Sequence, residues 1–163
     1  MPKAALIMGS KSDWQSLKGC VDILHGMEIE VEVHVASAHR TPEKVASFAA
    51  NARENGFEVI IAAAGKAAHL GGVLAAYTTL PVIGVPMATS VMGGMDSLLS
   101  IVQMPKGIPV ATVAIDGADN AAILAAQMIA LSDEALAARL AAFKADMAAE
   151  VTAKDEKVRA QFA

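Results

Sequence analysis

Three short loops carry the residue types that could bind a ligand or move a proton. The first follows the apolar residues 4–8 and reads Gly9-Ser10-Lys11-Ser12-Asp13. Glycine lets a ligand approach the backbone, and the N-terminus of a following helix offers free N–H groups, so this loop suits a phosphate. Asp13 suits a phosphate poorly, because two anions repel each other, and fits better beside ribose hydroxyls or an amine. The alternative is that Ser12 or Asp13 only caps the helix.

The second loop follows residues 29–35 and reads Ser37-Ala38-His39-Arg40-Thr41-Pro42. Arg40 can bind a phosphate through two parallel hydrogen bonds. Histidine takes up and releases a proton near neutral pH, so His39 is a candidate for acid–base chemistry. The alternatives are a solvated arginine and a histidine that only supports the start of the next helix.

The third loop, Ala64-Gly65-Lys66-Ala67-Ala68-His69-Leu70-Gly71-Gly72, contains a second candidate histidine. A lone histidine at a helix start is more often a hydrogen-bonded structural residue than a catalyst, so both interpretations of His69 stay open. No set of residues has the spacing of a metal site, and no G-x-S-x-G nucleophile elbow is present. Met87 is interpreted as a packing residue and Cys20 as a buried thiol without a catalytic role.

Alternating strand and helix patterns determine where these loops lie. Apolar or alternating runs predict five strands, at residues 4–8, 29–35, 57–64, 80–86 and 108–115. Helical spacing predicts helices at residues 14–24, 42–56, 69–77, 96–104 and 120–131, and a long one after Ser132. Thr41 and Ser132 are expected to cap their helices, and the fading apolar pattern beyond Val151 predicts a frayed tail or one that packs on a neighbouring chain.

This alternation predicts an α/β fold with a doubly wound, parallel, five-stranded sheet in the order 2-1-3-4-5. We expect one domain over residues 1–163, with an α/β core at 1–131 and a C-terminal helix and tail at 132–163. Ligands of such sheets bind beyond the carboxyl ends of the strands, at the switch point between strands 1 and 3. The three loops therefore converge on one predicted site.

The composition limits the partners and the compartment. Apolar residues make up 55% of the chain and charged residues 18%, which predicts that apolar surface is buried between subunits. The net charge of −4 gives no electrostatic footprint for nucleic acid. Residues 70–95 carry no charge, but repeated prolines and glycines argue against a membrane span. A single cysteine and the lack of a signal-peptide pattern fit a reducing cytoplasm.

Five stretches of the chain closely resemble the N5-carboxyaminoimidazole ribonucleotide mutase family of purine biosynthesis. They occur in order between residues 4 and 131, and they are Met8–Trp14, Ser37–Pro42, Ala67–Leu70, Leu80–Pro86 and Asp96–Pro105. The resemblance implies a flavodoxin-like fold assembled as a homo-octamer, which acts on a small-molecule ribonucleotide without a cofactor. The reaction that it implies moves a carboxylate to C4 of the aminoimidazole through trapped CO2.

The resemblance also implies roles for individual residues. His39 matches the general acid and base, and His69 matches a second active-site histidine. Ser10, Asp13 and Arg40 match the family's substrate-binding positions. We further expect the following residues to lie along the substrate: Ser12, Ser37, Ala38, Gly65, Lys66 and Leu70.

The sequence departs from the usual family pattern in two loops. Lys66 and Gly71 stand where the family usually has glycine and proline, and the loop at residues 116–120 is shorter than usual. One interpretation of Lys66 is a lysine that points to solvent or pairs with a carboxylate of a neighbouring subunit. The functional interpretation places its ammonium near the migrating carboxylate.

Three hypotheses for the function follow. A related branch of the family carboxylates aminoimidazole ribonucleotide with free CO2, and it typically has a basic residue near position 66. That branch usually lacks the histidine at position 69 and has lysine at position 40, so His69 and Arg40 favour the mutase over the carboxylase. The third hypothesis is a non-catalytic nucleotide-binding module, which would not need His39.

Overall fold

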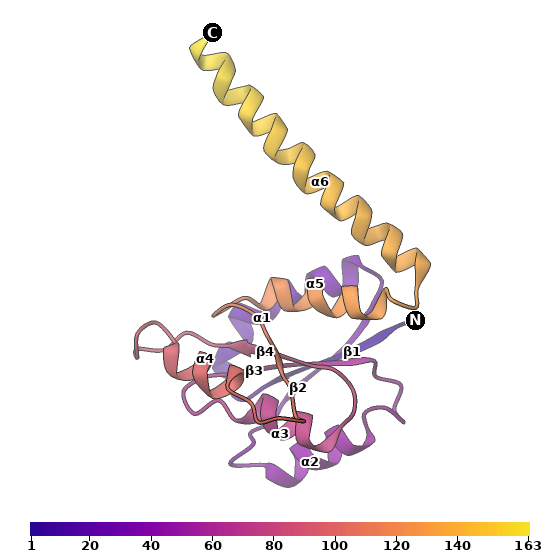
Figure 1. Ribbon diagram of the computed structural model, residues 1–163, viewed down its shortest axis with the longest axis vertical. Helices are drawn as coiled ribbons and strands as arrows, with labels where there is room; N and C mark the ends of the chain where they lie inside the picture. Colours follow the sequence, from indigo (N-terminus) through magenta and orange to yellow (C-terminus); the bar gives the residue numbers. More distant parts are fainter.

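The centre of the molecule is a parallel sheet of five strands in the order β2-β1-β3-β4-β5 (Figure 1). The computed structural model describes all residues from 1 to 163. The strands are β1 (Lys3–Met8), β2 (Glu30–Val35), β3 (Val59–Ala64), β4 (Val82–Pro86) and β5 (Ala111–Thr112). All neighbouring strands pair in parallel, so the predicted strand number, order and direction are confirmed.

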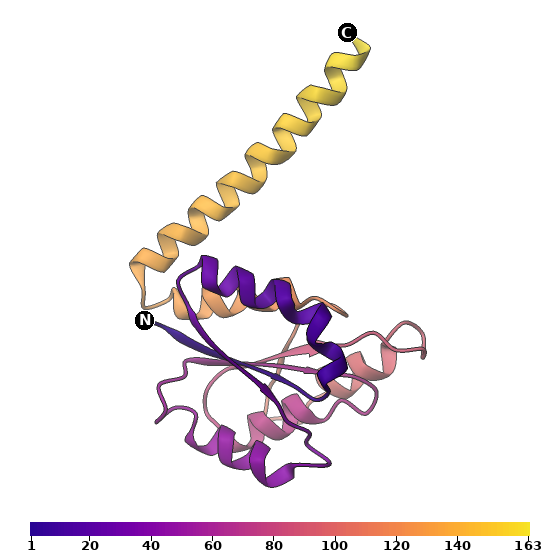
Figure 2. The same ribbon diagram turned by 180° about the vertical axis from the view of Figure 1, so that it is seen from behind.

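Helices cover both faces of the sheet. In Figures 1 and 2, α1 (Trp14–Gly26) and α5 (Ala118–Ile129) lie side by side on one face. The other face is covered by α2 (Pro42–Asn51), α3 (Leu70–Tyr77) and α4 (Met95–Val102). Each layer has its own apolar core, and the two cores lie on opposite sides of the sheet. This is the doubly wound arrangement that the alternating sequence predicts.

The apolar patterns explain these layers. Leu17, Cys20 and Leu24 recur on one face of α1, and all three are fully buried against the sheet. Every residue of β3 and β4 is buried, as expected for central parallel strands covered on both faces. The alternating β2 lies at the edge of the sheet and is only partly buried, which the sequence also predicts.

Gly84 in β4 lets the helix α4 pack closely on the sheet. A Cβ atom at this position would overlap the side chain of Ile101 and lie 2.9 Å from Cγ1 of Val110. Ile101 is fully buried, so the overlap could not be relieved by turning its side chain into solvent. The close approach of α4 to β4 therefore depends on a residue without a side chain.

The fifth strand is shorter than predicted. The ladder between β4 and β5 pairs only two residues, at Ala111 and Thr112, whereas the sequence predicts a strand over residues 108–115. Pro109 has no N–H to donate to a ladder. After Thr112 the chain follows β4 through separate hydrogen bonds, from Val113 N to Gly84 O and from Asp116 N to Pro86 O. Asp116 has a positive φ of 56°, which ends the extended segment.

The prediction that Ser132 caps the last helix is also wrong. Asp133, not Ser132, caps α6 (Glu134–Arg159), because its carboxylate accepts a hydrogen bond of 2.9 Å from Leu136 N. Thr41 does occupy the N-cap position of α2, with Pro42 next to it as predicted, but its side chain makes no cap bond. Its hydroxyl is already engaged with both backbone groups of Ser37.

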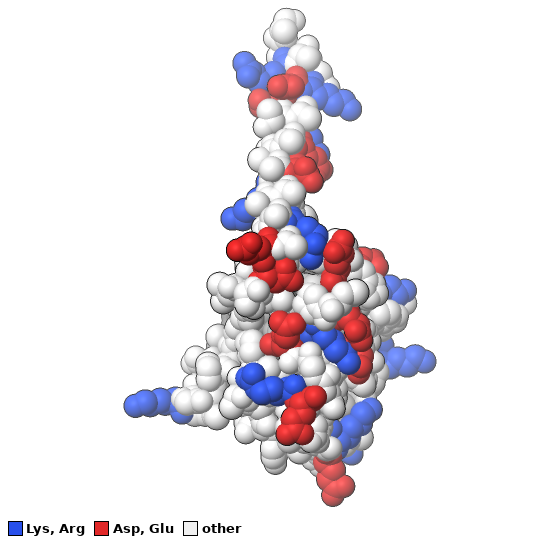
Figure 3. All heavy atoms as spheres, turned by 90° about the vertical axis from the view of Figure 1, so that its right-hand side faces the viewer, with Lys and Arg blue, Asp and Glu red and all other residues white.

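The helix α6 continues to Arg159 and projects from the body as a single rod (Figures 1 and 3). The sequence predicts that the tail beyond Val151 is frayed or packs on a neighbouring chain, and the first alternative is wrong. The helix persists because the segment is rich in strong helix formers, and ion pairs one turn apart join Glu150 to Lys154 and Asp155 to Arg159. Only Leu136 of α6 is buried. No helix of the chain has both the length and the apolar character needed to cross a membrane.

Candidate active site

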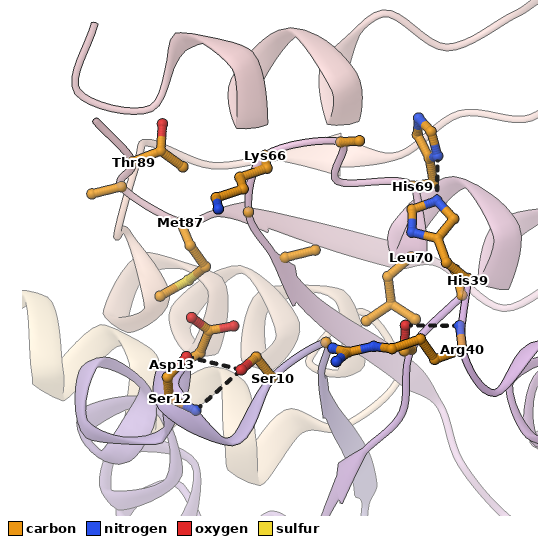
Figure 4. A pocket seen from close by; sticks show the side chains of 17 residues that line it. Ser10, Ser12, Asp13, His39, Arg40, Lys66, His69, Leu70, Met87 and Thr89 are labelled. Atoms are coloured by element: carbon orange, nitrogen blue, oxygen red, sulfur yellow. Dashed lines mark hydrogen bonds between the residues drawn. The ribbon is translucent and has the colours of Figure 1, made fainter. Parts of the chain in front are cut away.

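The carboxyl ends of four strands meet at one edge of the sheet and form a cavity of about 420 Å³ (Figure 4). The strand register brings them together, because Met8 of β1 pairs with Val35 of β2 and Ala63 of β3. All eleven residues expected at the site line this cavity: Ser10, Ser12, Asp13, Ser37, Ala38, His39, Arg40, Gly65, Lys66, His69 and Leu70.

The loop after β1 leaves one carboxylate free at the cavity. Ser10 caps a short 3-10 helix, and its Oγ accepts a hydrogen bond of 3.3 Å from Ser12 N. Asp13 makes no side-chain cap bond to α1, so the alternative in which Ser12 or Asp13 caps this helix is wrong. Burial raises the pKa of the Asp13 carboxyl, and the nearby Asp116 raises it further.

The loop after β2 is tied to itself. Thr41 Oγ1 accepts a hydrogen bond of 2.9 Å from Ser37 N and donates one of 3.0 Å to Ser37 O. Arg40 N donates to Ser37 Oγ at 3.1 Å. The Arg40 guanidinium makes no ion pair with the chain, and Figure 4 shows its side chain directed toward Ser10. This rigid backbone therefore presents a free cation to the cavity.

His39 and His69 form a hydrogen-bonded pair, although their loops are thirty residues apart. The distance from Nε2 of His39 to Nδ1 of His69 is 2.7 Å, and the rings meet nearly edge to face at 81°. One nitrogen of this bond must donate while the other accepts, so both cannot carry a proton at the same time. The bond leaves Nδ1 of His39 available to a ligand, and both rings are exposed in the single chain.

The loop after β3 has an unusual backbone at Lys66. This residue has a φ of 57°, in the left-handed region that favours glycine. Its backbone N–H donates a 2.9 Å hydrogen bond to Ser97 Oγ of α4. In Figure 4 the Lys66 side chain lies beside Met87, on the other side of the cavity from the histidine pair. Lys66 makes no ion pair with the chain, so its ammonium is also free to bind an anion.

The loop after β4 contributes a wall that sequence reasoning missed. Met87, Ala88 and Thr89 line the cavity, although Met87 is predicted only as a packing residue. Met87 does both, because it also belongs to the buried core. The rule that places ligands at strand carboxyl ends applies equally to β4, so this loop could have been included on that ground. Gly9, Ala64 and Ala67 complete the lining.

The charges around the cavity suit a phosphorylated sugar that carries a base. Arg40 and Lys66 supply two cations, and Asp13 supplies a carboxylate that can accept hydrogen bonds from hydroxyls. No group of three or more His, Cys, Asp or Glu side chains is placed to hold a metal ion. On the face drawn in Figure 3, acidic and basic side chains are intermixed and form no basic patch.

Known proteins resemble this chain over most of its length. The family model described as AIR carboxylase matches residues 3–150. The N5-carboxyaminoimidazole ribonucleotide mutase of Saccharolobus solfataricus is 53% identical over 93% of this chain and 96% of its own. The same-named protein of Mycobacterium tuberculosis is 52% identical over 97% of this chain and 91% of its own. The crystal structure of Treponema denticola PurE superposes with a TM-score of 0.86 at 28% identity, covering 96% and 98% of the two chains.

Proposed function

Because this chain belongs to the AIR carboxylase family, we propose that it is a mutase of purine biosynthesis that uses His39 as its proton carrier. It converts N5-carboxyaminoimidazole ribonucleotide to 4-carboxy-5-aminoimidazole ribonucleotide. The assignment of this reaction rests on sequence identity above 50% to curated mutases over nearly the whole chain. The histidine pair in a cavity with two free cations supports the assignment of the residues.

The reaction needs two proton transfers, and one histidine can serve both. In the first step the bond between N5 and its carboxylate breaks, the electron pair returns to nitrogen, and protonated His39 donates a proton there as CO2 leaves. In the second step C4 attacks the trapped CO2, and neutral His39 removes the C4 proton to restore the aromatic ring. His39 ends in the state in which it began, as a general acid–base group must. The aminoimidazole itself supplies the electron pair for carboxylation.

The hydrogen bond between His39 and His69 has a clear part in this scheme. It occupies Nε2 of His39 and so fixes which nitrogen of that ring faces the substrate. It also holds the ring in one orientation, which is what proton transfer to two neighbouring atoms of the substrate requires. His69 therefore positions the proton carrier and fixes its tautomer.

The remaining charged groups give the ribonucleotide an orientation. Arg40 and Ser10 bind the phosphate, since the free guanidinium extends toward Ser10 in Figure 4. Asp13 accepts hydrogen bonds from ribose hydroxyls. Lys66 lies at the far wall beside Met87, where its ammonium binds the substrate's carboxylate. In this proposal a cation lies at each charged end of the substrate.

The phosphate assignment is tested by comparing two ligands. Arg40→Ala should weaken binding of the nucleotide by about 1.5–3 kcal/mol, the range for hydrogen bonds to charged groups. Binding of the dephosphorylated nucleoside should change little. Calorimetry on both ligands measures the difference, and an unchanged preference for the nucleotide would remove Arg40 from the phosphate site.

The active enzyme is a homo-octamer in this proposal. His39 and His69 are exposed in the single chain, whereas CO2 must stay trapped between the two steps. Large apolar side chains are also exposed, among them Tyr77, Leu131 and Phe162. Contact with other chains would cover such surface. We place the enzyme in the cytoplasm, where the single buried thiol of Cys20 stays reduced.

One assay separates the mutase from the carboxylase. The purified protein is offered N5-carboxyaminoimidazole ribonucleotide without bicarbonate, and separately aminoimidazole ribonucleotide with bicarbonate. A mutase forms the C4 carboxylate rapidly from the first substrate and needs no added bicarbonate. Rapid product formation only from the second pair would assign the chain to the carboxylase branch. If the protein binds the nucleotide but converts neither substrate, the remaining hypothesis is a non-catalytic nucleotide-binding module.

A further inference from the structure

We propose that the first turns of α4 are a positioning device for the reaction, acting on the loop that carries His69. The device consists of Asp96, Ser97 and Ser100, which we call the α4 clamp. None of the three lines the cavity, so none is placed to touch the substrate. The inference rests on the proposed function, because it assigns these residues a role in that reaction.

The clamp holds both sides of one strained residue. Lys66 N donates a hydrogen bond of 2.9 Å to Ser97 Oγ. Ser100 Oγ donates its proton mainly to Asp96 O at 2.6 Å and makes a weaker, shared contact of 3.3 Å with Lys66 O. Lys66 is in the left-handed region, which a residue with a side chain adopts only when its surroundings impose it. The bond to Ser97 supplies most of that constraint, and the shared contact with Ser100 adds to it.

Ser97 stands out because it is the only buried polar or charged residue of the chain. Burial of a hydroxyl is unfavourable unless it is hydrogen-bonded, and the Lys66 N–H supplies that bond. Gly65 packs beside the same hydroxyl, since a Cβ there would lie 3.7 Å from Ser97 Oγ. An alanine would fill the space without the bond, so packing alone does not require a serine at this position.

Asp96 joins the clamp to a second wall of the cavity. One of its carboxylate oxygens accepts hydrogen bonds of 2.6 Å from Thr89 Oγ1 and 2.9 Å from Ser97 N. These bonds, the Thr89 bond first, lower the pKa of the Asp96 carboxyl, so the ionised form that accepts both is favoured. The cavity-lining Thr89 and the Lys66 backbone are therefore fixed to the same helix start.

The clamp acts on the histidine pair through a short, bonded segment. Ala68 N donates a 2.8 Å hydrogen bond to Lys66 O, and His69 N donates one of 2.9 Å to Ala67 O. Ala68 is buried, so this turn cannot shift freely as a surface loop would. A change in the Lys66 backbone is thus passed over three residues to His69, and from there to His39 across their 2.7 Å bond.

The test begins with Ser97→Ala, which removes the buried hydroxyl and keeps the packing. We expect kcat to fall about 10- to 100-fold, as for small misplacements of catalytic groups, while KM changes much less. Ile29→Val is the control, because Ile29 is fully buried at the amino end of β2, away from the cavity. It should lower the thermal midpoint without lowering kcat. A Ser97→Ala enzyme with wild-type kcat overturns the proposal.

A second measurement does not depend on turnover. Histidine ring ¹⁵N signals report the hydrogen bond between His39 and His69, and Ser97→Ala should shift both signals. His25 and His34 are internal standards whose signals should stay in place. Shifted signals in a protein that proves inactive as a mutase would keep the positioning role and reject the function. Unshifted signals would reject the positioning role whatever the enzyme catalyses.

A double variant tests whether the clamp acts through the Lys66 backbone. Glycine adopts the left-handed region without strain, so Lys66→Gly removes the need for a clamp even if it lowers activity itself. Adding Ser97→Ala to Lys66→Gly should therefore cost much less kcat than Ser97→Ala costs in the natural chain. An equal fold-loss in both backgrounds would show that Ser97 does not act through this backbone, and the proposal would fail.

Discussion

His39 carries the proposed chemistry at the scale of single residues. His39→Asn keeps a polar side chain but removes the group that takes up and returns the proton. Turnover should fall by roughly 10²–10⁴-fold, the range for a general acid–base group. Nucleotide affinity should change little, because the phosphate is assigned to Arg40 and Ser10. Steady-state kinetics and calorimetry on the same preparation measure the two effects.

The matched control for this variant is His25→Asn, since His25 is an exposed histidine of α1 outside the cavity. It should turn over like the natural enzyme. If His39→Asn does so as well, another group transfers the protons.

The carboxyl of Asp13 makes a pH dependence predictable. Its pKa is raised, first by burial and then by the charge of Asp116, so it keeps its proton to a higher pH than an ordinary aspartic acid. Protonated Asp13 accepts hydrogen bonds from ribose hydroxyls less well. Nucleotide affinity should therefore decline as the pH falls through this raised pKa. The folded state gains from the proton, so this group's contribution to stability is lost as the pH rises through the same pKa.

Asp116→Asn tests that account without disturbing the backbone. The amide oxygen can still accept the 2.9 Å hydrogen bond from Ala88 N, and asparagine tolerates the positive φ at this position. Removing the charge should move the pH midpoint of nucleotide binding to a lower value and stabilise the protein at neutral pH. Binding titrations over a pH series measure the midpoint. An unchanged midpoint would mean that Asp13 does not control binding.

The site residues that lie in loops directly after strands could be predicted from the sequence. Parallel strands place their carboxyl ends at one edge, so Ser10, His39 and His69 could be expected together from chain order. The direct bond between the two histidines was not predictable, because no pattern fixes how far apart two loops of a pocket lie. Ser97 was missed because its importance comes from burial and from the backbone of Lys66.

At the scale of elements, the helices and strands with the strongest apolar patterns were predicted best. The spacing of Trp14, Leu17, Val21 and Leu24 predicted α1, and all four side chains pack in or against its core. The uninterrupted apolar run of β3 placed that strand at the centre. The apolar content of residues 108–115 predicted a fifth strand longer than the observed one. A hydrogen-bonded strand ladder needs N–H donors and regular φ angles as well as apolar residues. The frayed alternative for the tail beyond Val151 was wrong, because helix propensity and ion pairs can continue a helix whose side chains there are exposed.

The close packing of α4 on β4 predicts how a substitution at Gly84 changes the stability of the fold. Gly84→Ala should destabilise the fold by about 1–3 kcal/mol, the usual effect of overpacking a core, because the new Cβ overlaps Ile101. Gly26→Ala is the control, since a Cβ at Gly26 meets nothing within 4 Å. It should leave the stability unchanged or raise it slightly. Denaturant unfolding measures both, and equal stability of the two variants would contradict the packing account.

At the scale of the whole molecule, the surface predicts assembly. Light scattering at micromolar concentration should give eight times the 16.7 kDa mass of one chain. The paired change Val151→Asp with Phe162→Asp places charges on exposed apolar positions of the C-terminal segment. It should lower the mass of the assembly and leave the folded single chain intact, because exposed substitutions have little effect on stability. A monomer from the natural chain would reject the octamer.

The position of α6 at the end of the chain affects the order in which the protein is made. Every residue that lines the cavity lies between positions 9 and 89, and the last strand ends at Thr112. The projecting rod begins only at Glu134. During synthesis from the N-terminus, the strands and the cavity-lining loops therefore leave the ribosome before the rod does. On the proposal that the rod docks on other chains, a nascent chain cannot use it for assembly until the whole sheet has been translated.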